Sequence, residues 1–266
     1  MLAAAMLLAA TMTQAATRQQ TIRIDNVTVG KTFDGIGAVN GGGATSVLLK
    51  DYPDPWRSQI MDMVFKPMWG ASVSTMLVEI PGDGNSTQGS MPSHSHHRGD
   101  FNARRGYTWW VLREAADRNP SITLDATAWS APRWVGDFWS QDMADYYVGW
   151  LKGLRYEHGL EMDAIGCHNE KGWSADFAKA LRSAMNRNGF SNVRLHGFDN
   201  WGDDKMEFVP VMKEDPELAA AIADLRDGDT VRIAAGTYTM DAAAPFAYMI
   251  SNRIDVAIVG EGAGAV

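Results

Sequence analysis

The chain has 266 residues, of which 45% are hydrophobic and 21% are charged. That length suits one large α/β domain or two smaller ones, and the hydrophobic content is sufficient for a sizeable core. The net charge of −8 argues against nucleic acid as a ligand, because phosphates require a basic surface. Ten tryptophans offer flat apolar faces that suit sugar rings, although tryptophans also serve simply to fill a core.

Residues 1–16, MLAAAMLLAATMTQAA, are predicted to be a signal peptide, because an apolar stretch of the right length ends on small residues at Ala15 and Ala16. The stretch is too short for a transmembrane helix, and no other segment is apolar enough to cross a bilayer. We therefore expect a secreted or periplasmic protein without a transmembrane segment. Cys167 is the only cysteine, so no internal disulfide can form. The residues identify no protein partner.

Strand-like apolar runs alternate with amphipathic segments through residues 21–212. The predicted strands are 21–29, 33–39, 71–80, 122–129, 162–168 and 193–198. The predicted helices after the first are 107–118, 143–156 and 175–186, and 81–106 is a long predicted loop. This alternation indicates a parallel α/β sheet, which could be a (β/α)8 barrel or a doubly wound sheet. Polar or aromatic residues at several strand ends favour the mouth of a barrel, namely Glu79, Trp129, Asn169-Glu170 and Asp199-Asn200.

The first predicted helix begins at Asp54-Pro55, because an aspartate cap and a first-turn proline favour a helix start. Its predicted buried face consists of Trp56, Ile60, Met63 and Val64. In the later helices, the apolar stripes are Tyr147, Trp150, Leu151 and Leu154 in one, and Phe177, Leu181 and Met185 in the other.

The segment Met162–Glu170, MDAIGCHNE, is an apolar run that ends on Asn169-Glu170. Such a run is typical of a buried parallel strand, so Glu170 would lie at the carboxyl edge of the sheet. That edge carries the chemistry of (β/α)8 barrels. A glutamate in this place suits general acid–base work, although a salt-bridged strand end would give the same pattern.

Short motifs follow one another in a fixed order between residues 33 and 201. They are FDGIGAVNGGGATS at 33–46, YPDPWRSQI at 52–60, FKPMWGAS at 65–72, VEIPGDG at 78–84, PSHSHH at 92–97, RGYTWW at 105–110, RNPSITL at 118–124, WSAPRW at 129–134 and GCHNE at 166–170. With these motifs the segment resembles the galactocerebrosidase (galactosylceramidase) family of retaining β-galactosidases. The resemblance implies a (β/α)8 TIM-barrel fold, a galactoside or galactolipid substrate, and no cofactor.

The resemblance also assigns roles to residues of this sequence. It implies that Glu170 is the acid/base and that Asn169 hydrogen-bonds the 2-hydroxyl group of the sugar. Thr87 and Trp129 are implied to hold the galactose. The family nucleophile is a second glutamate in a segment resembling WSSE, and no such segment occurs here.

Retaining hydrolysis needs a second carboxylate, and three residues of this chain are candidates. Glu261 closes an apolar run, Asp199 ends a predicted strand, and Glu79 lies at the end of an earlier predicted strand. Each also has an ordinary structural interpretation, in a turn or at a strand end. Without a nucleophile no covalent intermediate can form, so the sequence does not establish activity for this chain.

The segment 215–266 resembles the start of a right-handed parallel β-helix of the pectin-lyase kind. PELAAAIADL is similar to its capping helix, and DGDTVRIAAGTYT and VAIVGEGAG are similar to its first coils. We therefore expect an incomplete barrel of about five βα units at 21–212, joined to a short β-rich segment, as in a truncated or chimeric product. Three functions remain open: a retaining β-galactosidase, a galactoside-binding remnant without catalysis, and a β-helix protein that acts on polysaccharide.

No metal site is expected. His94, His96 and His97 could suggest zinc, but they lie in a predicted loop without an adjacent carboxylate. Cys167 is interpreted as a buried strand residue. Gly41-Gly42-Gly43 permits a tight bend but lacks the following lysine of a phosphate-binding loop.

Overall fold

The computed structural model describes residues 35–41, 49–86, 89–200 and 207–223. The predicted signal peptide, the predicted strand 21–29 and most of the β-helix-like segment lie outside these residues. Within the described residues, no helix is long and apolar enough to cross a membrane.

The main sheet has five strands, and every neighbouring pair is parallel. They are β1 (Gly37–Asn40), β2 (Thr75–Ile80), β5 (Thr123–Ala128), β6 (Ala164–Asn169) and β7 (Arg194–Asp199). Their spatial order is the order of the chain, because β3 (Asn85–Ser86) and β4 (Gly89–Ser90) form a separate antiparallel hairpin. A doubly wound sheet reverses its strand order at a switch point. The strictly sequential order found here is that of a (β/α) barrel.

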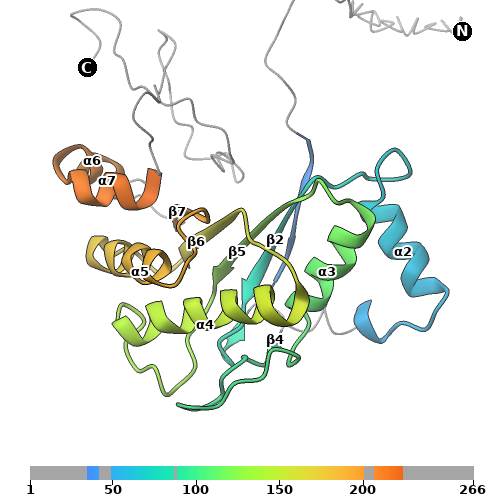
Figure 1. The fold of residues 1–266 in the computed structure, drawn as a ribbon, viewed down its shortest axis with the longest axis horizontal. Coiled ribbons are helices and arrows are strands. Elements are labelled where there is room, and N and C mark those ends of the chain that lie inside the picture. Colours follow the sequence, from blue (N-terminus) through green and yellow to red (C-terminus); the bar gives the residue numbers. More distant parts are fainter. Residues whose placement is uncertain (1–34, 42–48, 87–88, 201–206, 224–266) are drawn as a thin grey trace, which may run out of the picture. The chain divides into compact units, whose positions relative to one another are not determined.

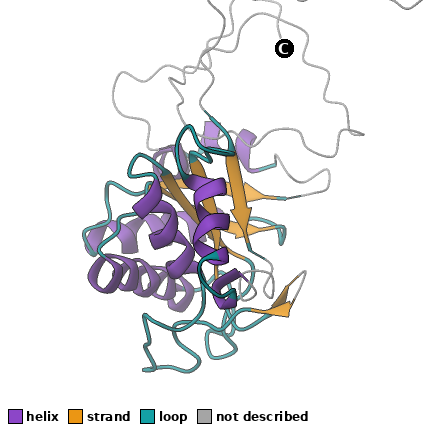
Figure 2. Cartoon of the chain, turned by 90° about the vertical axis from the view of Figure 1, so that its right-hand side faces the viewer, coloured by secondary structure: helices purple, strands orange, loops and turns teal. Residues whose placement is uncertain are grey.

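Four of the helices lie between successive strands and two follow β7, and they gather on one side of the sheet (Figures 1 and 2). They are α2 (Trp56–Phe65), α3 (Thr108–Arg118), α4 (Gln141–His158), α5 (Ala175–Arg187), α6 (Phe208–Glu214) and α7 (Pro216–Ala223). Helices on one side leave the opposite face of the strands for the interior of the barrel. The fold is therefore of the (β/α) barrel type, as predicted.

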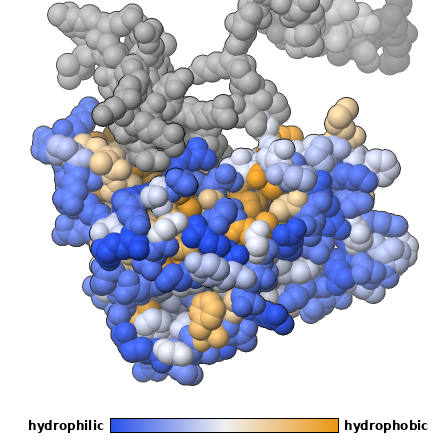
Figure 3. All heavy atoms as spheres, viewed as in Figure 1, coloured by the Kyte–Doolittle hydropathy of each residue, from blue (hydrophilic) through white to orange (hydrophobic). Residues whose placement is uncertain are grey.

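The core lies between the sheet and these helices, and the predicted stripes of α4 and α5 are confirmed. Tyr147, Trp150, Leu151 and Leu154 are at most 1% exposed, and Phe177, Leu181 and Met185 are completely buried. Serines cap both helices: Ser140 accepts a hydrogen bond from the backbone N–H of Met143, and Ser174 accepts one from Phe177. The face of the molecule seen in Figure 3 is mostly hydrophilic, with apolar side chains in scattered patches.

The predicted orientation of α2 is wrong. Its buried residues are Met61 and Phe65, whereas Trp56 is 60% exposed and Met63 is 61% exposed. Apolar residues occur on both sides of this helix, so its periodicity alone does not decide which stripe meets the core. Asp54 provides no side-chain cap and pairs instead with Arg57 at 2.6 Å.

Several boundaries also differ from the prediction. Strand β2 begins at Thr75 rather than at Ala71, because the preceding turn folds back on α2: the backbone N–H groups of Ala71 and Val73 donate to Met63 and Val64. The long predicted loop contains the β3–β4 hairpin. Helix α6 was not predicted, and α7 begins at Pro216 near the predicted start.

The buried hydroxyl of Tyr147 joins α4 to two strands. It donates to the carbonyl of Cys167 in β6 at 2.8 Å and accepts a hydrogen bond from the backbone N–H of Ala128 in β5 at 3.3 Å. Strands β5 and β6 are paired in register only at Thr127 and Gly166 among the described residues. The tyrosine hydroxyl therefore supplies hydrogen bonds that the strand ladder does not.

We predict that Tyr147→Phe lowers the free energy of unfolding by about 1–3 kcal/mol, because two buried backbone groups lose their partner while the ring still fills its site. Urea unfolding followed by circular dichroism measures the change. The matched control is Tyr52→Phe, at a residue that is 47% exposed, which should stay within about 0.5 kcal/mol of the parent chain. Equal effects of the two substitutions would contradict the bridging role.

Candidate active site

Polar and aromatic side chains meet where β5, β6 and β7 end. Trp129 directly follows β5, Asn169 is the last residue of β6, and Asp199 is the last residue of β7. In a parallel sheet the carboxyl ends of all strands lie at one edge, which in (β/α) barrels is the catalytic edge. The structure therefore brings three of the sequence-predicted residues together, with Glu170 next in the chain.

The side chain of Asn169 lies between Trp129 and Asp199. Its amide satisfies both neighbours in one orientation, in which Nδ2 donates to Asp199 Oδ2 at 3.2 Å and Oδ1 accepts from Trp129 Nε1 at 3.1 Å. Asn169 is 7% exposed and Asp199 is its register partner on β7. Trp129 is half-buried, so part of the residue remains accessible at the edge of the sheet.

Glu170 is exposed and has an uncommon backbone conformation for a residue with a side chain, with φ at 57°. Its backbone N–H donates to the carbonyl of Asp199 at 2.5 Å. Two residues later, the backbone N–H of Gly172 donates to Asn200 Oδ1 at 3.0 Å. These two hydrogen bonds hold the turn that carries Glu170 against the end of β7.

The electrostatic environment of Asp199 has contributions of both signs. Desolvation of its carboxyl group and the negative charge of Glu170 raise the pKa of Asp199 above its ordinary value of 3.8, while His196 acts in the opposite direction. The residue as a whole is exposed, so the desolvation comes from the protein atoms around the carboxyl group itself. A raised pKa means that the neutral carboxylic acid forms at a higher pH than it does for an ordinary aspartate.

Glu79 and Gly41 lie beside Trp129. A Cβ atom at Gly41 would be 3.0 Å from the indole ring of Trp129 and 3.4 Å from Cβ of Glu79, so the glycine admits the ring. Glu79 is completely buried. Because its side chain is buried, Glu79 suits a structural role at the strand end better than the role of a nucleophile that attacks a substrate.

A charged pair on the barrel-interior face was not predicted from the sequence. His196 Nε2 of β7 lies 3.0 Å from Asp125 Oδ1 of β5. Desolvation opposes the charged imidazole, but the charge and hydrogen bond of Asp125 outweigh it and raise the pKa of His196 above 6.5. Asp125 itself stands out in the sequence, since it is the one charged residue of β5.

Gly166 of β6 lies between the two partners. A Cβ atom there would come within 2.4 Å of His196 Cε1 and within 2.8 Å of Thr127 Oγ1. The pair therefore spans β6, the strand between β5 and β7, and it does so over Gly166, where no side chain stands in the way.

The structure describes only some of the remaining predicted residues. Thr87 and Glu261 lie outside the described residues. His94 is 3% exposed and stacks on Tyr146 with ring centroids 4.1 Å apart, and desolvation lowers its pKa to about 3. His96 pairs instead with Asp83 at 2.8 Å. Within the described part of the chain, no three histidine, cysteine or acidic side chains are grouped to hold a metal ion.

Cys167 is fully buried in β6, as its sequence context predicted, and burial raises the pKa of its thiol.

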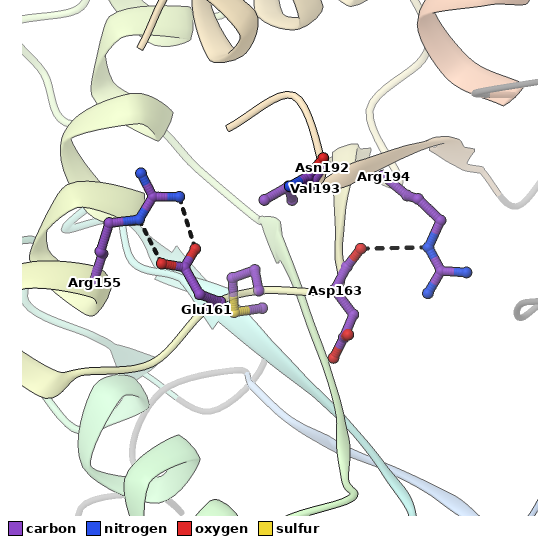
Figure 4. Close-up of a pocket in the computed structure, with 7 residues that line it drawn as sticks. Arg155, Glu161, Asp163, Asn192, Val193 and Arg194 are labelled. Carbon is purple, nitrogen blue, oxygen red and sulfur yellow. Dashed lines mark hydrogen bonds and ion pairs between the residues drawn. The ribbon is translucent and has the colours of Figure 1, made fainter. Parts of the chain in front are cut away.

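A pocket of about 540 Å³ lies at the opposite edge of the sheet, where β6 and β7 begin (Figure 4). It is lined by Arg155, Glu161, Met162, Asp163, Asn192, Val193 and Arg194. Glu161 accepts two hydrogen bonds from Arg155, at 2.5 Å and 2.7 Å, so these charges neutralise each other. The amino-terminal edge of a barrel generally serves stability, and we place the candidate active site at the other edge.

Comparison with known proteins decides the family. The family model described as "Glycosyl hydrolase family 59" matches residues 33–226. The chain belongs to glycosyl hydrolase family 59.

Curated relatives agree with membership of family 59. The chain is 47% identical over 182 residues to a galactocerebrosidase of Homo sapiens and 46% identical over the same length to one of Salmo salar. It is 33% identical over 185 residues to a putative galactocerebrosidase of Caenorhabditis elegans. These matches cover 66–68% of this chain and 27–28% of the relatives. The family 59 chain thus spans little more than a quarter of their length.

Solved structures agree with the fold. An endo-β-1,6-glucanase matches with a TM-score of 0.59 and 22% identity, over 73% of this chain and 50% of its own. SrfJ from Salmonella typhimurium also matches with a TM-score of 0.59, at 18% identity over 72% of this chain and 49% of its own. At these sequence identities, the similarity shows a shared fold and nothing more.

We predict that Asp125→Asn lowers the free energy of unfolding of this family 59 chain by about 1 kcal/mol near pH 6, because the charged His196 loses its anionic partner. The raised pKa of His196 fixes the sign of the pH dependence. The stabilisation is complete below the ordinary value of 6.5 and is lost as the pH rises through the folded-state pKa.

Urea unfolding at a series of pH values measures this loss, with the exposed Asp51→Asn as the control. A stability difference between Asp125→Asn and the parent that stays constant from acidic to alkaline pH would contradict the pairing.

Proposed function

We propose that the carboxyl edge of the sheet binds the galactosyl ring of a galactolipid and takes part in retaining hydrolysis of its β-galactosidic bond. The observation that carries this proposal is the grouping of Trp129, Asn169 and Glu170 at one edge, with the Asn169 amide hydrogen-bonded on both sides. The names of the relatives, galactocerebrosidases, support galactosylceramide as the substrate class.

The chemistry of each group suits the proposed role. The half-buried indole of Trp129 offers an apolar face to a sugar ring. The Nδ2 of Asn169 carries two hydrogens, of which one is used by Asp199, so the other can donate to a sugar hydroxyl. The left-handed backbone of Glu170 is an uncommon conformation of the kind that clusters at functional sites.

In the proposed mechanism Glu170 donates its proton to the glycosidic oxygen as the bond between that oxygen and the anomeric carbon breaks. A carboxylate nucleophile attacks the anomeric carbon from the opposite face and forms a glycosyl–enzyme intermediate. Glu170, now ionised, removes a proton from a water molecule that attacks the same carbon. The bond between that carbon and the nucleophile breaks, which regenerates the carboxylate and releases galactose with retained configuration.

The nucleophile must be a second carboxylate about 5–5.5 Å from the acid. Asp199 already accepts a hydrogen bond from Asn169 through Oδ2, so one of its two carboxylate oxygens is engaged with a side chain of the protein. Glu79, the third acid weighed from the sequence, is completely buried, which leaves Glu261, outside the described residues, as the remaining candidate nucleophile of this chain. Thr87 remains a proposed contact of the sugar.

We also propose export, because residues 1–16 have the apolar character and small-residue end of a signal peptide. Amino-terminal sequencing of the expressed chain tests it: cleavage after Ala15 or Ala16 supports export, and an intact amino terminus in a secretion-competent host contradicts it.

We predict that Glu170→Gln slows release of the aryl group from an aryl β-galactoside by about 10²–10⁴-fold, because the amide cannot donate a proton to the leaving oxygen. Absorbance of the released phenolate measures the rate. Glu214→Gln, at an exposed residue of α6, is the matched control and should keep the parental rate. Parental turnover by Glu170→Gln would overturn the assignment.

One observation favours a second function, the binding of galactosides without turnover. Glu170 is exposed, whereas a general acid that keeps its proton near neutral pH is normally desolvated. Calorimetric titration with galactose separates the two functions. Heat of binding without hydrolysis by the parent chain supports the binding function, and hydrolysis that depends on Glu170 supports the enzyme.

A further inference from the structure

The amide of Asn169 lies between two groups whose hydrogen-bonding roles cannot be exchanged. The indole Nε1–H of Trp129 can only donate, and an ionised carboxylate such as that of Asp199 can only accept. A donor on one side and an acceptor on the other permit a single orientation of the amide. In that orientation Oδ1 faces the indole at 3.1 Å and Nδ2 faces the carboxylate at 3.2 Å.

We propose that Asp199 is a positioning residue, whose ionised carboxylate fixes the orientation of the Asn169 amide and, through it, the hydrogen bond to Trp129. The role differs from that of a nucleophile, because Asp199 acts on another side chain and not on the substrate. The sequence analysis assigned to no residue the task of orienting the Asn169 side chain.

The backbone supports the same assignment. Asn169 and Asp199 are register partners on neighbouring strands, so their side chains start from adjacent positions. The carbonyl of Asp199 also accepts the hydrogen bond from the Glu170 backbone N–H at 2.5 Å. One residue of β7 thus contacts both members of the Asn-Glu pair, through its side chain in one case and its backbone in the other.

Protonation of Asp199 removes the constraint. A neutral carboxylic acid can donate as well as accept, so it no longer requires Nδ2 on its side. The amide can then rotate, and Trp129 Nε1–H loses its obligatory acceptor.

Charged groups on two strands set the pH at which this happens. Glu170, which follows β6, disfavours the ionised form of Asp199, and His196 on β7 favours it. His196 is in turn paired with Asp125 of β5. Desolvation also acts to raise the pKa of Asp199, whereas the hydrogen bond from Asn169 Nδ2 favours its ionised form, and a carboxyl group with these opposing neighbours titrates in the acidic range.

The consequence for the sugar rests on the proposed function. With the amide fixed, Asn169 offers its second Nδ2 hydrogen to a galactose hydroxyl. With the amide free to rotate, that donor is present only part of the time, and galactose binds more weakly at acidic pH.

The test follows the indole Nε1–H resonance of Trp129 in the ¹⁵N-labelled full chain, without ligand, from about pH 3.5 to pH 8. Trp129→Phe assigns the resonance. We expect a single titration step in the acidic part of this range. Asp199→Asn should remove the step, because an amide does not titrate.

Two further variants separate positioning from a general effect of nearby charge. Asn169→Ala should also remove the step, since it breaks the connection while leaving the carboxylate in place. Glu170→Gln should keep the step and move its midpoint to lower pH, because the repelling charge is gone. A step that survives in Asp199→Asn or in Asn169→Ala would overturn the proposal, and so would a parent chain whose resonance does not titrate.

Galactose titration near neutral pH then tests the link to the sugar. Asp199→Asn should weaken galactose binding by about fivefold to tenfold. Unchanged affinity would overturn that link. If the parent chain shows the titration step and binds no galactose, the positioning role stands and the proposed function fails.

Discussion

The parallel pairing of β6 with β7 is the constraint on which the candidate active site depends. It makes Asn169 and Asp199 neighbours, and it continues beyond the strands in the hydrogen bond from the Glu170 backbone to Asp199. Because this bond holds the turn after β6, the position of the acid follows from the ladder and not from contacts of its own exposed side chain. The pairing of these two strands thus positions the side chains of the candidate site.

The two faces of the sheet differ in composition and in role. On the helix side, aliphatic and aromatic residues provide the stability of the fold, with Tyr147 as the hydrogen-bonded link between α4 and the strands. On the opposite face, Asp125, Thr127 and His196 form a polar surface below the strand ends. Such a division is usual in (β/α) barrel enzymes, where loops and strand ends can vary in chemistry above a conserved scaffold.

The sequence predicted the features that depend on local pattern. Helices α4 and α5 follow from their apolar periodicity, and the place of Asn169-Glu170 at a strand end follows from the buried run before it. Features that depend on long-range packing were not predictable in the same way. The buried stripe of α2 is decided by tertiary contacts, since both sides of that helix are apolar. The pairing of Asp125 with His196 joins residues 71 positions apart, and no local pattern connects them.

The bridge between Asp125 and His196 also bears on how β6 is aligned during folding. A slip by two residues keeps each side chain on its own face of a sheet, so hydrophobic patterning alone does not prevent it. After such a slip, Ala164 or His168 would stand where Gly166 now admits the imidazole, and even a methyl group would collide at 2.4 Å. Gly166 and the ion pair together therefore favour a single register of β6, the strand that ends in Asn169.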